Sequence, residues 1–597
     1  MPNRNIFYAD IFVDELVRAG LKTVCLAPGS RNTPLVMAFA KHPHIKVYSH
    51  LDERSAAFFA LGIGMATGTP SAVVCTSGTA VANFFPAVVE ATQSSIPLLV
   101  ISADRPPELR DSGANQTIDQ VKIFGDYPLW AVDLPTPEGN PSALTIRYLR
   151  SIANRAIATT IGTRRGVVHI NMPFRKPLEP IPVQTDSVGV PNDAIARDES
   201  LPYISYDNFA DDPRMIPQML VNRLADVFTR TPKILLVCGT HCPPDLPEAL
   251  NDFAPIYPII VDGASGLRLK IANSITAYDT FLNMPHTLPT PDVVVRFGYV
   301  PTSNWLNVYL DNLPAHVRRV HIHENGVWAD DSYRTDWFIQ ADPTLIMTHV
   351  IKAIYADSRA YFAMGEENEA YRQNAGQFAS AWQALERATW DALSSELATT
   401  WFDGAVVHQA VKLLPENSIL FVGNSLPIRN FDQFGRGENR QIHAYGMRGA
   451  SGIDGNISVA LGLGAGHGDN PLCAIIGDIT AYHDMNGLLA VRRCGVPITL
   501  VVVNNDGGGI FHRLPIAQFD PEFTDYFLTP HGLTFAPVAQ LYGLDYANPQ
   551  SAEAFEAIFA DSIQTRKSVL IEVRTDSAGD FATRKALLAR VKEAVLG

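Results

Sequence analysis

Strand-like runs of apolar residues alternate with helical stretches along this whole chain, and they do so in three successive sets. Such alternation is typical of α/β domains built on parallel sheets. The chain has 597 residues, too many for one core, so roughly two to four domains are expected. We interpret these runs as strands: 23–27, 72–76, 97–103 and 166–171 in the first set, 233–238, 257–262, 292–297 and 318–323 in the second, and 418–422, 472–476, 498–504 and 568–573 in the third.

The fold class predicted from this pattern is α/β, with three doubly wound parallel-sheet domains. A segment rich in Pro, Asp and Ser follows the first set and is interpreted as a linker. A segment rich in Ala, Glu and Gln precedes the third set and is interpreted as helical. The expected boundaries are an N-terminal domain at 1–180, a linker at 181–214, a central domain at 215–357, a helical connection at 358–400 and a C-terminal domain at 401–597.

Composition excludes several classes of function. The net charge of −14 disfavours nucleic acid and acidic membrane surfaces as partners, and an anionic substrate would need a local group of arginines. Four of the six cysteines lie in strand-like apolar runs, which is typical of reduced thiols in a cytosolic protein. The N-terminus has no leader pattern and no run of about 18 apolar residues occurs. We therefore expect a cytoplasmic protein without membrane insertion.

Two strand ends in the third set carry metal-binding chemistry. The sequence Gly-Asp-Ile-Thr begins at Gly477, directly after a strand-like run. Asn505 stands 27 residues after Asp478, at the end of the next run, and is followed by Asp-Gly-Gly-Gly. A carboxylate, an amide oxygen and a backbone carbonyl at Gly507 are hard ligands that suit Mg²⁺. Gly477 and Thr480 fit a diphosphate, because free N–H groups and a hydroxyl begin the helix there.

This pattern resembles the thiamine-diphosphate motif, in which GD-x-[ST] is followed after about 25–30 residues by NN. The alternative is an ordinary strand–turn–helix unit, because turns also favour Gly-Asp and Asn-Asn. A second glycine-rich segment, starting at Gly462, resembles a dinucleotide loop. Its spacing is wrong and it precedes a strand, so we interpret it as close helix packing and disfavour NAD.

Thiamine diphosphate also needs a carboxylic acid beside its aminopyrimidine ring. Glu53 follows a short strand and opens a helix of apolar and small residues, where desolvation would raise the pKa of a carboxyl. A helix-start acid stabilised by the dipole is the alternative, and it would suit Asp52 equally. Because the cofactor motif is also present, we favour Glu53 as the catalytic acid.

The chain as a whole resembles the 2-succinyl-5-enolpyruvyl-6-hydroxy-3-cyclohexene-1-carboxylate synthases, thiamine-diphosphate enzymes of menaquinone biosynthesis. The resemblance covers the first and third sets well and the central part loosely. It lies in Ala-Pro-Gly-Ser-Arg-Asn-Thr-Pro (27–34), Ser-His-Leu-Asp-Glu-Arg (49–54), Thr-Ser-Gly-Thr-Ala-Val-Ala-Asn (76–83), Ala-Asp-Arg-Pro-Pro-Glu-Leu (103–109), Gly-Ala-Asn-Gln-Thr-Ile (113–118), Gly-Asn-Ser-Leu-Pro-Ile-Arg (423–429), Met-Arg-Gly-Ala-Ser-Gly-Ile-Asp-Gly (447–455) and Asn-Asn-Asp-Gly-Gly-Gly-Ile-Phe (504–511).

The resemblance implies a pyrimidine-binding N-terminal domain, a transhydrogenase-like central domain and a diphosphate-binding C-terminal domain. It implies a homodimer or tetramer in which Glu53 and the metal site facing it come from different subunits. Ile453 would be the apolar wedge under the cofactor, and Mn²⁺ could replace Mg²⁺. The implied metal ligands are Asp478, Asn505 and Gly507, and the implied cofactor-binding residues are Glu53, Ser425, Gly449, Ser451, Ile453, Gly477, Ile479, Thr480, Asn505 and Ile510.

The implied reaction, in menaquinone or phylloquinone biosynthesis, is decarboxylation of 2-oxoglutarate followed by 1,4-addition to isochorismate. Both substrates are dicarboxylates, and the forked guanidinium of arginine binds carboxylates well. By motif the substrate-binding residues are Ser30, Arg31, Arg105, Asn115, Gln116, Arg429, Arg448 and Phe511. Arg54 is interpreted as structural, while His50 fits a proton relay and a hydrogen-bonded core residue equally.

One central-domain loop departs from the family. Some members carry basic residues after Phe-Gly, whereas this chain has Asn304 and Trp305 there. Arg296 or Arg268 could compensate for the missing charge. The remaining alternatives are an acetolactate-synthase-like carboligase, a 2-oxoacid decarboxylase and a cofactor-binding homologue without catalysis. Pro-Gly-Ser-Arg in place of Pro-Gly-Gly favours a dicarboxylate over pyruvate, and retention of Glu53 and Asp478 disfavours a silent homologue.

Overall fold

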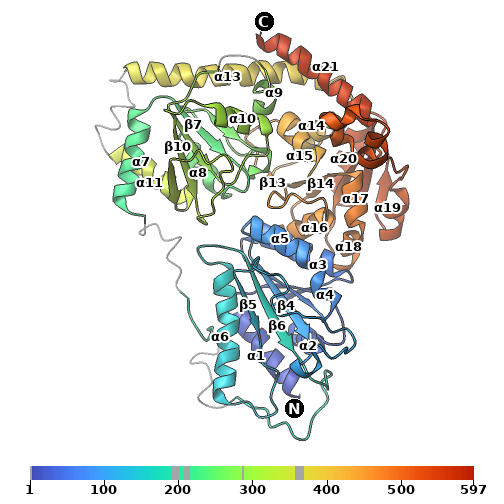
Figure 1. Cartoon of the computed structure of the whole chain (residues 1–597). Helices are drawn as coiled ribbons and strands as arrows, with labels where there is room; N and C mark the ends of the chain where they lie inside the picture. Colours follow the sequence, from blue (N-terminus) through green and yellow to red (C-terminus); the bar gives the residue numbers. More distant parts are fainter. Residues whose placement is uncertain (1–2, 191–200, 207–215, 285–287, 357–368, 597) are drawn as a thin grey trace. The chain divides into compact units, whose positions relative to one another are not determined.

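The computed structural model describes residues 3–190, 201–206, 216–284, 288–356 and 369–596. Within them the strands form three parallel sheets, which confirms the predicted fold class (Figure 1). The chain divides into two compact units. One comprises Met1–Asn208, Gly449–Asp469 and His483–Pro497, and the other comprises Phe209–Arg448, Asn470–Tyr482 and Ile498–Gly597. The first sheet belongs to the first unit, and the second and third sheets belong to the second. The predicted domain boundaries stay predictions, and most of the predicted linker lies outside the described residues.

The sheet of the first unit has the strand order β2-β1-β3-β4-β6-β5. Its central strands are fully buried, so they appear in the sequence as continuous apolar runs. Helices α1, α2 and α6 pack on one face through a shared apolar core. The strands are β1 (Thr23–Leu26), β2 (Lys46–Ser49), β3 (Ser71–Cys75), β4 (Leu98–Asp104), β5 (Trp130–Asp133) and β6 (Val167–Pro173), and the helices of this part are α1 (Arg4–Arg18), α2 (Thr33–Lys41), α3 (Glu53–Thr67), α4 (Thr79–Ala82), α5 (Phe85–Gln93) and α6 (Ala143–Thr160).

The central sheet has the order β11-β10-β9-β7-β8 and is covered on both faces. Alternate residues of its strands pack on α7, α8 and α11 or on α9, α10 and α13. Figure 1 shows α7 and α11 side by side. The elements are α7 (Gln218–Arg230), β7 (Ile234–Cys238), α8 (Leu246–Leu250), β8 (Ile259–Val261), α9 (Tyr278–Phe281), β9 (Val293–Phe297), α10 (Asn304–Asn312), β10 (Arg318–His323), β11 (Trp337–Gln340), α11 (Pro343–Ala356) and α13 (Glu369–Leu397).

The third sheet has the order β13-β12-β14-β15-β17-β16. Its core is shared with α14, α15 and α20. Parallel pairing brings the carboxyl ends of β14 and β15 to one edge, with Gly477 opposite Val503. The elements from here to the C-terminus are α14 (Asp403–Leu413), β12 (Ile419–Val422), α15 (Leu426–Phe434), β13 (His443–Tyr445), α16 (Asn456–His467), β14 (Leu472–Gly477), α17 (Asp478–Asp484), α18 (Leu489–Arg493), β15 (Thr499–Asn504), α19 (Ala536–Tyr542), β16 (Asp545–Ala547), α20 (Ala552–Thr565), β17 (Val569–Arg574) and α21 (Ser577–Leu596).

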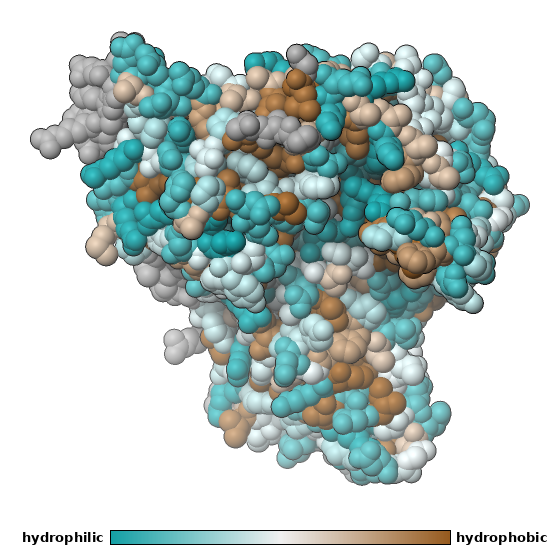
Figure 2. Space-filling view, turned by 45° about the horizontal axis from the view of Figure 1, so that its top comes forward, coloured by the Kyte–Doolittle hydropathy of each residue, from teal (hydrophilic) through white to brown (hydrophobic). Residues whose placement is uncertain are grey.

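Large apolar residues also occur at the surface, but they come from many separate elements. On the face shown in Figure 2, brown apolar patches alternate with teal polar ones. Single exposed apolar side chains of this kind are ordinary for a globular chain. Among the described helices, none combines the length and the hydropathy needed to cross a membrane.

The glycine-rich segment near Gly462 packs two helices tightly together in the first unit. A Cβ on Gly462 would lie 2.1 Å from the Phe59 carbonyl oxygen of α3, and a Cβ on Gly62 would lie 2.2 Å from the Val459 carbonyl oxygen of α16. Both neighbours are backbone atoms, which cannot move aside as a flexible side chain can. Helix packing is therefore the reason for the glycines, as the sequence predicted.

We expect Gly462→Val to destabilise the protein by about 1–3 kcal/mol, because the added methyl groups force α3 and α16 apart. The midpoint of urea unfolding measures this change. Gly376→Ala is the matched control, since Gly376 lies within helix α13 and a Cβ there meets no atom within 4 Å. That control should gain about 0.5–1 kcal/mol from helix propensity. Equal midpoints for Gly462→Val and the wild type would contradict the packing argument.

Candidate active site

Asp478 lies where β14 ends, beside the end of β15 in the second unit. Asp478 is 3% exposed. One carboxylate oxygen accepts the Gly507 N–H at 2.9 Å, and the other accepts the Ile479 N–H at 2.7 Å. Burial raises the pKa of Asp478, while these hydrogen bonds and one from His531 oppose the rise. The structure thus brings Asp478 next to the segment after Asn505.

The glycine run after Asn505 is required by close backbone contacts. Gly507 has a φ of +130°, and a Cβ there would lie 2.0 Å from the Leu528 carbonyl oxygen. Gly508 donates its N–H to that same oxygen at 2.7 Å. A Cβ on Gly509 would meet the Asn505 side-chain nitrogen at 2.5 Å, so Asn505 is packed in place. This fold of the loop keeps Asn505 and Gly507 at the strand edge that holds Asp478.

The donor set suits a hard cation. It combines one carboxylate with an amide oxygen of Asn505 and the carbonyl of Gly507, which already accepts the Gly509 N–H at 2.9 Å and keeps a second lone pair. Within the described ranges, no three His, Cys, Asp or Glu side chains gather as a metal site. The oxygen set at Asp478 is of a different kind, with a single carboxylate, and its chemistry fits Mg²⁺.

His531 is a residue of this site that the sequence did not indicate. Its Nδ1 accepts the Leu533 N–H at 2.9 Å, so the neutral ring carries its proton on Nε2. That nitrogen lies 3.2 Å from the Asp478 carboxylate and donates to it. The backbone N–H of His531 donates to Asp506 at 3.0 Å. The only sequence signal was His-Gly in an irregular segment, which is too weak to predict this contact.

The predicted diphosphate residues lie around the same edge. In the described part of the chain, apart from its two neighbours in sequence, no residue has an atom within 4 Å of the Gly477 Cβ position, so the space beside it is open. Thr480 is buried, and Ile479 and Ile510 are half-buried. Ser425 precedes α15 and has φ of +74°, a conformation that costs a non-glycine residue about 1–3 kcal/mol. Open space, backbone N–H groups and a strained turn are compatible with a bound diphosphate.

Two of the predicted arginines, Arg429 and Arg448, lie together in the second unit. A further arginine that was not predicted, Arg513, lies beside them. The Arg429 Nη1 donates to the Ser425 carbonyl at 2.6 Å, and the Arg448 Nη1 donates to Asn424 at 2.9 Å. Burial lowers the pKa of Arg429, and the neighbouring Arg448 and Arg513 lower it further. Arg513 was not indicated by the sequence. A group of cations that repel one another is what a bound anion would stabilise. Phe511, in the same 3₁₀ segment as Arg513, packs edge-on against Phe527 at 5.6 Å between centroids.

Glu53 and Asp52 have separate roles at the start of α3 in the first unit. Asp52 is the helix cap, because its carboxylate accepts the Ser55 N–H at 3.3 Å. Glu53 is half-buried in the first turn. It lies near enough to Cys75, at the end of β3, to raise the pKa of that buried thiol together with desolvation. Capping therefore does not require Glu53, which leaves its carboxyl for another purpose.

Arg31 and Arg105 form a second pair of cations, in the first unit. Arg31 is 7% exposed, and its Nη1 donates to the Phe174 carbonyl at 2.6 Å, while its Nε has no partner among the described residues. Burial and the nearby Arg105 lower the pKa of Arg31. A buried guanidinium with an unused N–H fits a site for an anion. Ser30 precedes Arg31 and is exposed.

Ser77 joins Arg105 to the loop that carries Asn115 and Gln116. The Arg105 guanidinium donates to the Ser77 hydroxyl, and the Gln116 side chain donates to the Ser77 carbonyl at 2.9 Å. Gln116 has φ of +55°, and Asn115 beside it is exposed. The Gln120 side chain accepts the N–H of Gly78, the residue after Ser77, at 2.9 Å. Neither Ser77 nor Gln120 was singled out from the sequence, although Ser77 lies within a quoted motif.

Glu90 holds the predicted cofactor loop in the first unit. Its carboxylate accepts the N–H groups of Gly449 and Ala450 at 2.9 and 2.7 Å. A Cβ on Gly449 would lie 2.5 Å from the Ser94 hydroxyl, so only glycine fits. Ser451 has φ of +59°, and Ile453 is half-buried. Glu90 was not indicated by the sequence, since its partners are backbone groups about 360 positions away.

Arg54 and His50 of the helix-start motif both contact other residues of the first unit. Arg54 donates to the His483 carbonyl at 2.5 Å and lies 3.7 Å from the buried Asp484. Burial lowers the pKa of His50 to about 4, so its ring is neutral at physiological pH. His50 packs against Phe59.

The suggestion that Arg268 compensates for Asn304 and Trp305 is wrong. Arg268 is completely buried and donates to four backbone carbonyls, so it cannot reach a substrate. Arg296 is half-buried and donates to the Ala329 carbonyl. Asn304 starts α10 and is exposed, while Trp305 is half-buried.

Comparison with known proteins agrees with the thiamine-diphosphate chemistry. A family model described as "Thiamine pyrophosphate enzyme, N-terminal TPP binding domain" matches residues 7–123, and one described as "Thiamine pyrophosphate enzyme, C-terminal TPP binding domain" matches residues 429–573. Three relatives share the name 2-succinyl-5-enolpyruvyl-6-hydroxy-3-cyclohexene-1-carboxylate synthase. The one from Roseiflexus sp. (strain RS-1) is 55% identical and covers 99% of both chains, and that from Roseiflexus castenholzii is 53% identical over 98% of this chain and 99% of its own. The protein from Haloarcula marismortui is 41% identical over 100% of this chain and 99% of its own.

Proposed function

Because this chain belongs to the family of 2-succinyl-5-enolpyruvyl-6-hydroxy-3-cyclohexene-1-carboxylate synthases, we propose that it decarboxylates 2-oxoglutarate and adds the resulting four-carbon unit to isochorismate. The observation that carries this proposal is the match to relatives of that name over 99% of both chains. The pathway is menaquinone biosynthesis, and the cofactors are thiamine diphosphate and Mg²⁺.

Thiamine diphosphate, when bound, supplies the centre at which a 2-oxoacid loses CO₂ and becomes a nucleophile. Asp478, Asn505 and Gly507 would hold the metal ion, and Gly477, Thr480 and Ser425 would bind the diphosphate. Glu53 would present its carboxyl to the aminopyrimidine, and Ile453 would support the cofactor between its rings. The proposed active unit is a dimer in which Glu53 and Asp478 of one site belong to different subunits.

The arginines are assigned to the carboxylates of the two substrates. Arg31 and Arg105 form one cationic pair in the first unit, with Gln116 fixed beside them through Ser77. Arg429 and Arg448 form the other pair in the second unit. Each pair offers forked donors that lack a carboxylate partner of their own at salt-bridge distance among the described residues. The reaction has two dicarboxylate substrates, and one arginine pair is available for each of them.

The direct test follows isochorismate by absorbance with purified protein, thiamine diphosphate, Mg²⁺ and 2-oxoglutarate. We expect consumption that requires both the cofactor and 2-oxoglutarate. If isochorismate persists while CO₂ leaves 2-oxoglutarate, the acceptor is wrong. If neither substrate reacts and pyruvate does, an acetolactate-type carboligase replaces the proposal.

We expect Arg31→Ala to raise the KM for a dicarboxylate substrate by about 10²-fold, because a charge-assisted bond worth about 2–3 kcal/mol is lost. Thiamine-diphosphate affinity should stay within about twofold. Arg155→Ala is the matched control, since Arg155 is exposed and stacks on Trp130 in the same unit. Loss of cofactor binding in Arg31→Ala would mean that Arg31 serves the cofactor instead.

A further inference from the structure

Helix α15 is unusually polar for a buried helix. Seven of its nine residues are buried, and three of those seven, Asn430, Asp432 and Gln433, carry polar side chains. Asn430 donates to Asp403 at 2.9 Å, and Gln433 accepts from Arg584 at 2.8 Å. Buried polar groups require specific hydrogen-bond partners. Such a helix can therefore form all of its side-chain hydrogen bonds in only one position.

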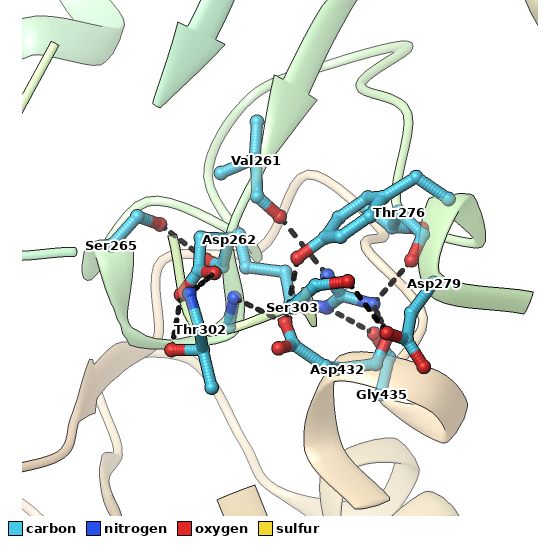
Figure 3. Close-up of polar contacts among 12 residues, drawn as sticks. Val261, Asp262, Ser265, Thr276, Asp279, Thr302, Ser303, Asp432 and Gly435 are labelled. Carbon is cyan, nitrogen blue, oxygen red and sulfur yellow. Dashed lines mark hydrogen bonds and ion pairs between the residues drawn. The ribbon is translucent and has the colours of Figure 1, made fainter. Parts of the chain in front are cut away.

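Asp432 joins α15 to the central sheet, as Figure 3 shows. One carboxylate oxygen accepts the Gly263 N–H and the Tyr278 hydroxyl, both at 2.7 Å. Gly263 follows β8, and Tyr278 begins α9. A Cβ on Gly263 would lie 2.8 Å from the same carboxylate oxygen, so the helix approaches this loop as closely as the backbone permits.

Arg268 holds the carboxyl end of the same helix. Its guanidinium donates to the Asp432 carbonyl at 2.6 Å and to the Gly435 carbonyl at 2.7 Å. It also donates to the Val261 and Thr276 carbonyls, so one side chain ties the helix end to the segments around β8 (Figure 3). A cation at a helix C-terminus is stabilised by the helix dipole as well.

The charges around Asp432 come from all the elements packed there. Asp262 from the end of β8 and Asp279 from α9 repel its carboxylate, and Arg268 at 3.7 Å attracts it. Tyr278 donates to it from α9, and Arg429 lies on the same helix. Burial and the two carboxylates raise the pKa of Asp432 to about 8. Burial and the two neighbouring carboxylates therefore favour the protonated acid in the folded protein.

The opposite end of α15 carries the candidate site. Ser425 precedes the helix in the strained conformation with φ of +74°, and Arg429, one turn later, donates to the Ser425 carbonyl at 2.6 Å. A strained turn persists only where the surroundings hold it. The nine-residue helix is short enough for its anchored end to fix the turn.

We propose that Asp432 and Arg268 are positioning residues that fix α15 against the loop after β8, and thereby hold the Ser425 turn and Arg429 in place for the cofactor diphosphate and a substrate carboxylate. The proposal rests on the proposed function for the roles of Ser425 and Arg429. The central sheet contributes no residue to the predicted cofactor set. According to this proposal, it nevertheless affects cofactor binding through α15.

The test is Asp432→Ala, assayed by thiamine-diphosphate binding with Mg²⁺ in isothermal titration calorimetry. We expect cofactor Kd and substrate KM each to rise about tenfold or more, because Gly263 and Tyr278 lose their acceptor and α15 is released. Hydrogen exchange of the α15 amides should accelerate. Asp432→Asn keeps an acceptor oxygen in place and should restore most of the binding.

Tyr278→Phe keeps the test decisive if Asp432→Ala does not fold, since it removes one hydroxyl only. We expect it to raise cofactor Kd about three- to tenfold. Glu15→Gln is the matched control, because Glu15 is a buried carboxyl that accepts from Asn154 at 2.6 Å in the first unit and contacts no site residue. It should leave both constants unchanged.

A folded Asp432→Ala or Tyr278→Phe with normal Kd, KM and α15 exchange would overturn the proposal, even if its melting temperature fell. Failure of the proposed function is separate. In that case isochorismate would not react with the wild type, whereas calorimetry with thiamine diphosphate would still compare the variants.

A second readout uses pH. The folded protein holds a proton on Asp432 up to about pH 8, while the unfolded chain releases it near pH 4, so this residue's contribution to stability is lost as pH rises through that window. The melting temperature of Asp432→Asn minus that of the wild type should therefore increase from pH 5 to pH 8 and then level off. A constant difference would contradict the neutral acid at Asp432.

Discussion

Glu53→Gln is expected to lower kcat by about 10²–10⁴-fold while thiamine diphosphate still binds with Mg²⁺. The amide has nearly the shape of the acid but cannot exchange a proton with the aminopyrimidine. The structure removes the competing explanation for Glu53, because Asp52 provides the helix cap. Stopped-flow or steady-state consumption of isochorismate measures kcat, and calorimetry measures cofactor binding.

The matched control for this variant is Glu553→Gln. Glu553 is also an acid in the first helical turn, in α20, and it is exposed. If the effect at Glu53 came from the helix dipole, both variants would lose a little stability and neither would lose activity. Near-normal turnover in Glu53→Gln would remove Glu53 from the catalytic role.

The sequence predicted the inner strands of all three sheets and the edge strand β8, but it missed most of the other edge strands. Inner strands are buried on both faces and therefore appear as apolar runs, as in β3 and β4. The strands missed by the sequence lie at sheet edges and are partly exposed, such as β5, β11 and β16. Three or four partly exposed residues carry no apolar pattern that could be distinguished from a loop.

Within the candidate site, the sequence indicated residues that belong to motifs and missed those that support them. Glu90 and Gln120 bind backbone N–H groups, and a backbone partner leaves no trace in the sequence. His531 reaches Asp478 from an irregular segment 53 positions away. These contacts depend on tertiary structure, so only coordinates could reveal them.

For Arg268 the sequence made the opposite error, because it suggested a substrate-binding role that the structure does not support. As an arginine of the central part of the chain, which also holds Asn304 and Trp305, it was a reasonable candidate to replace the missing charge. In the structure its donors are used by the backbone around α15 and β8. Sequence position gives no measure of burial for a single arginine, and burial is what separates a positioning role from direct substrate contact.

Asp478→Asn should weaken Mg²⁺-dependent binding of thiamine diphosphate by about 10²-fold, equal to about 2.7 kcal/mol. The amide keeps an oxygen for the Ile479 or Gly507 N–H, but it removes the only negative charge in the proposed metal set. Calorimetric titration at several Mg²⁺ concentrations measures the loss. Asp330→Asn is the control, because Asp330 is also buried and accepts the Thr335 N–H at 2.7 Å in the central part of the chain. Unchanged metal dependence would exclude Asp478 as a ligand.

Combining Glu53→Gln with Asp478→Asn, at a cofactor concentration too low to saturate Asp478→Asn, tests the proposed dimer. If Glu53 and Asp478 of one site come from different subunits, a heterodimer of Glu53→Gln and Asp478→Asn chains has one site with both changes and one site with neither. Co-expression with two affinity tags should then yield a heterodimer with about half the wild-type kcat per dimer, since one of two sites is intact. If both residues of a site belong to one chain, each site carries one change and the heterodimer stays inactive.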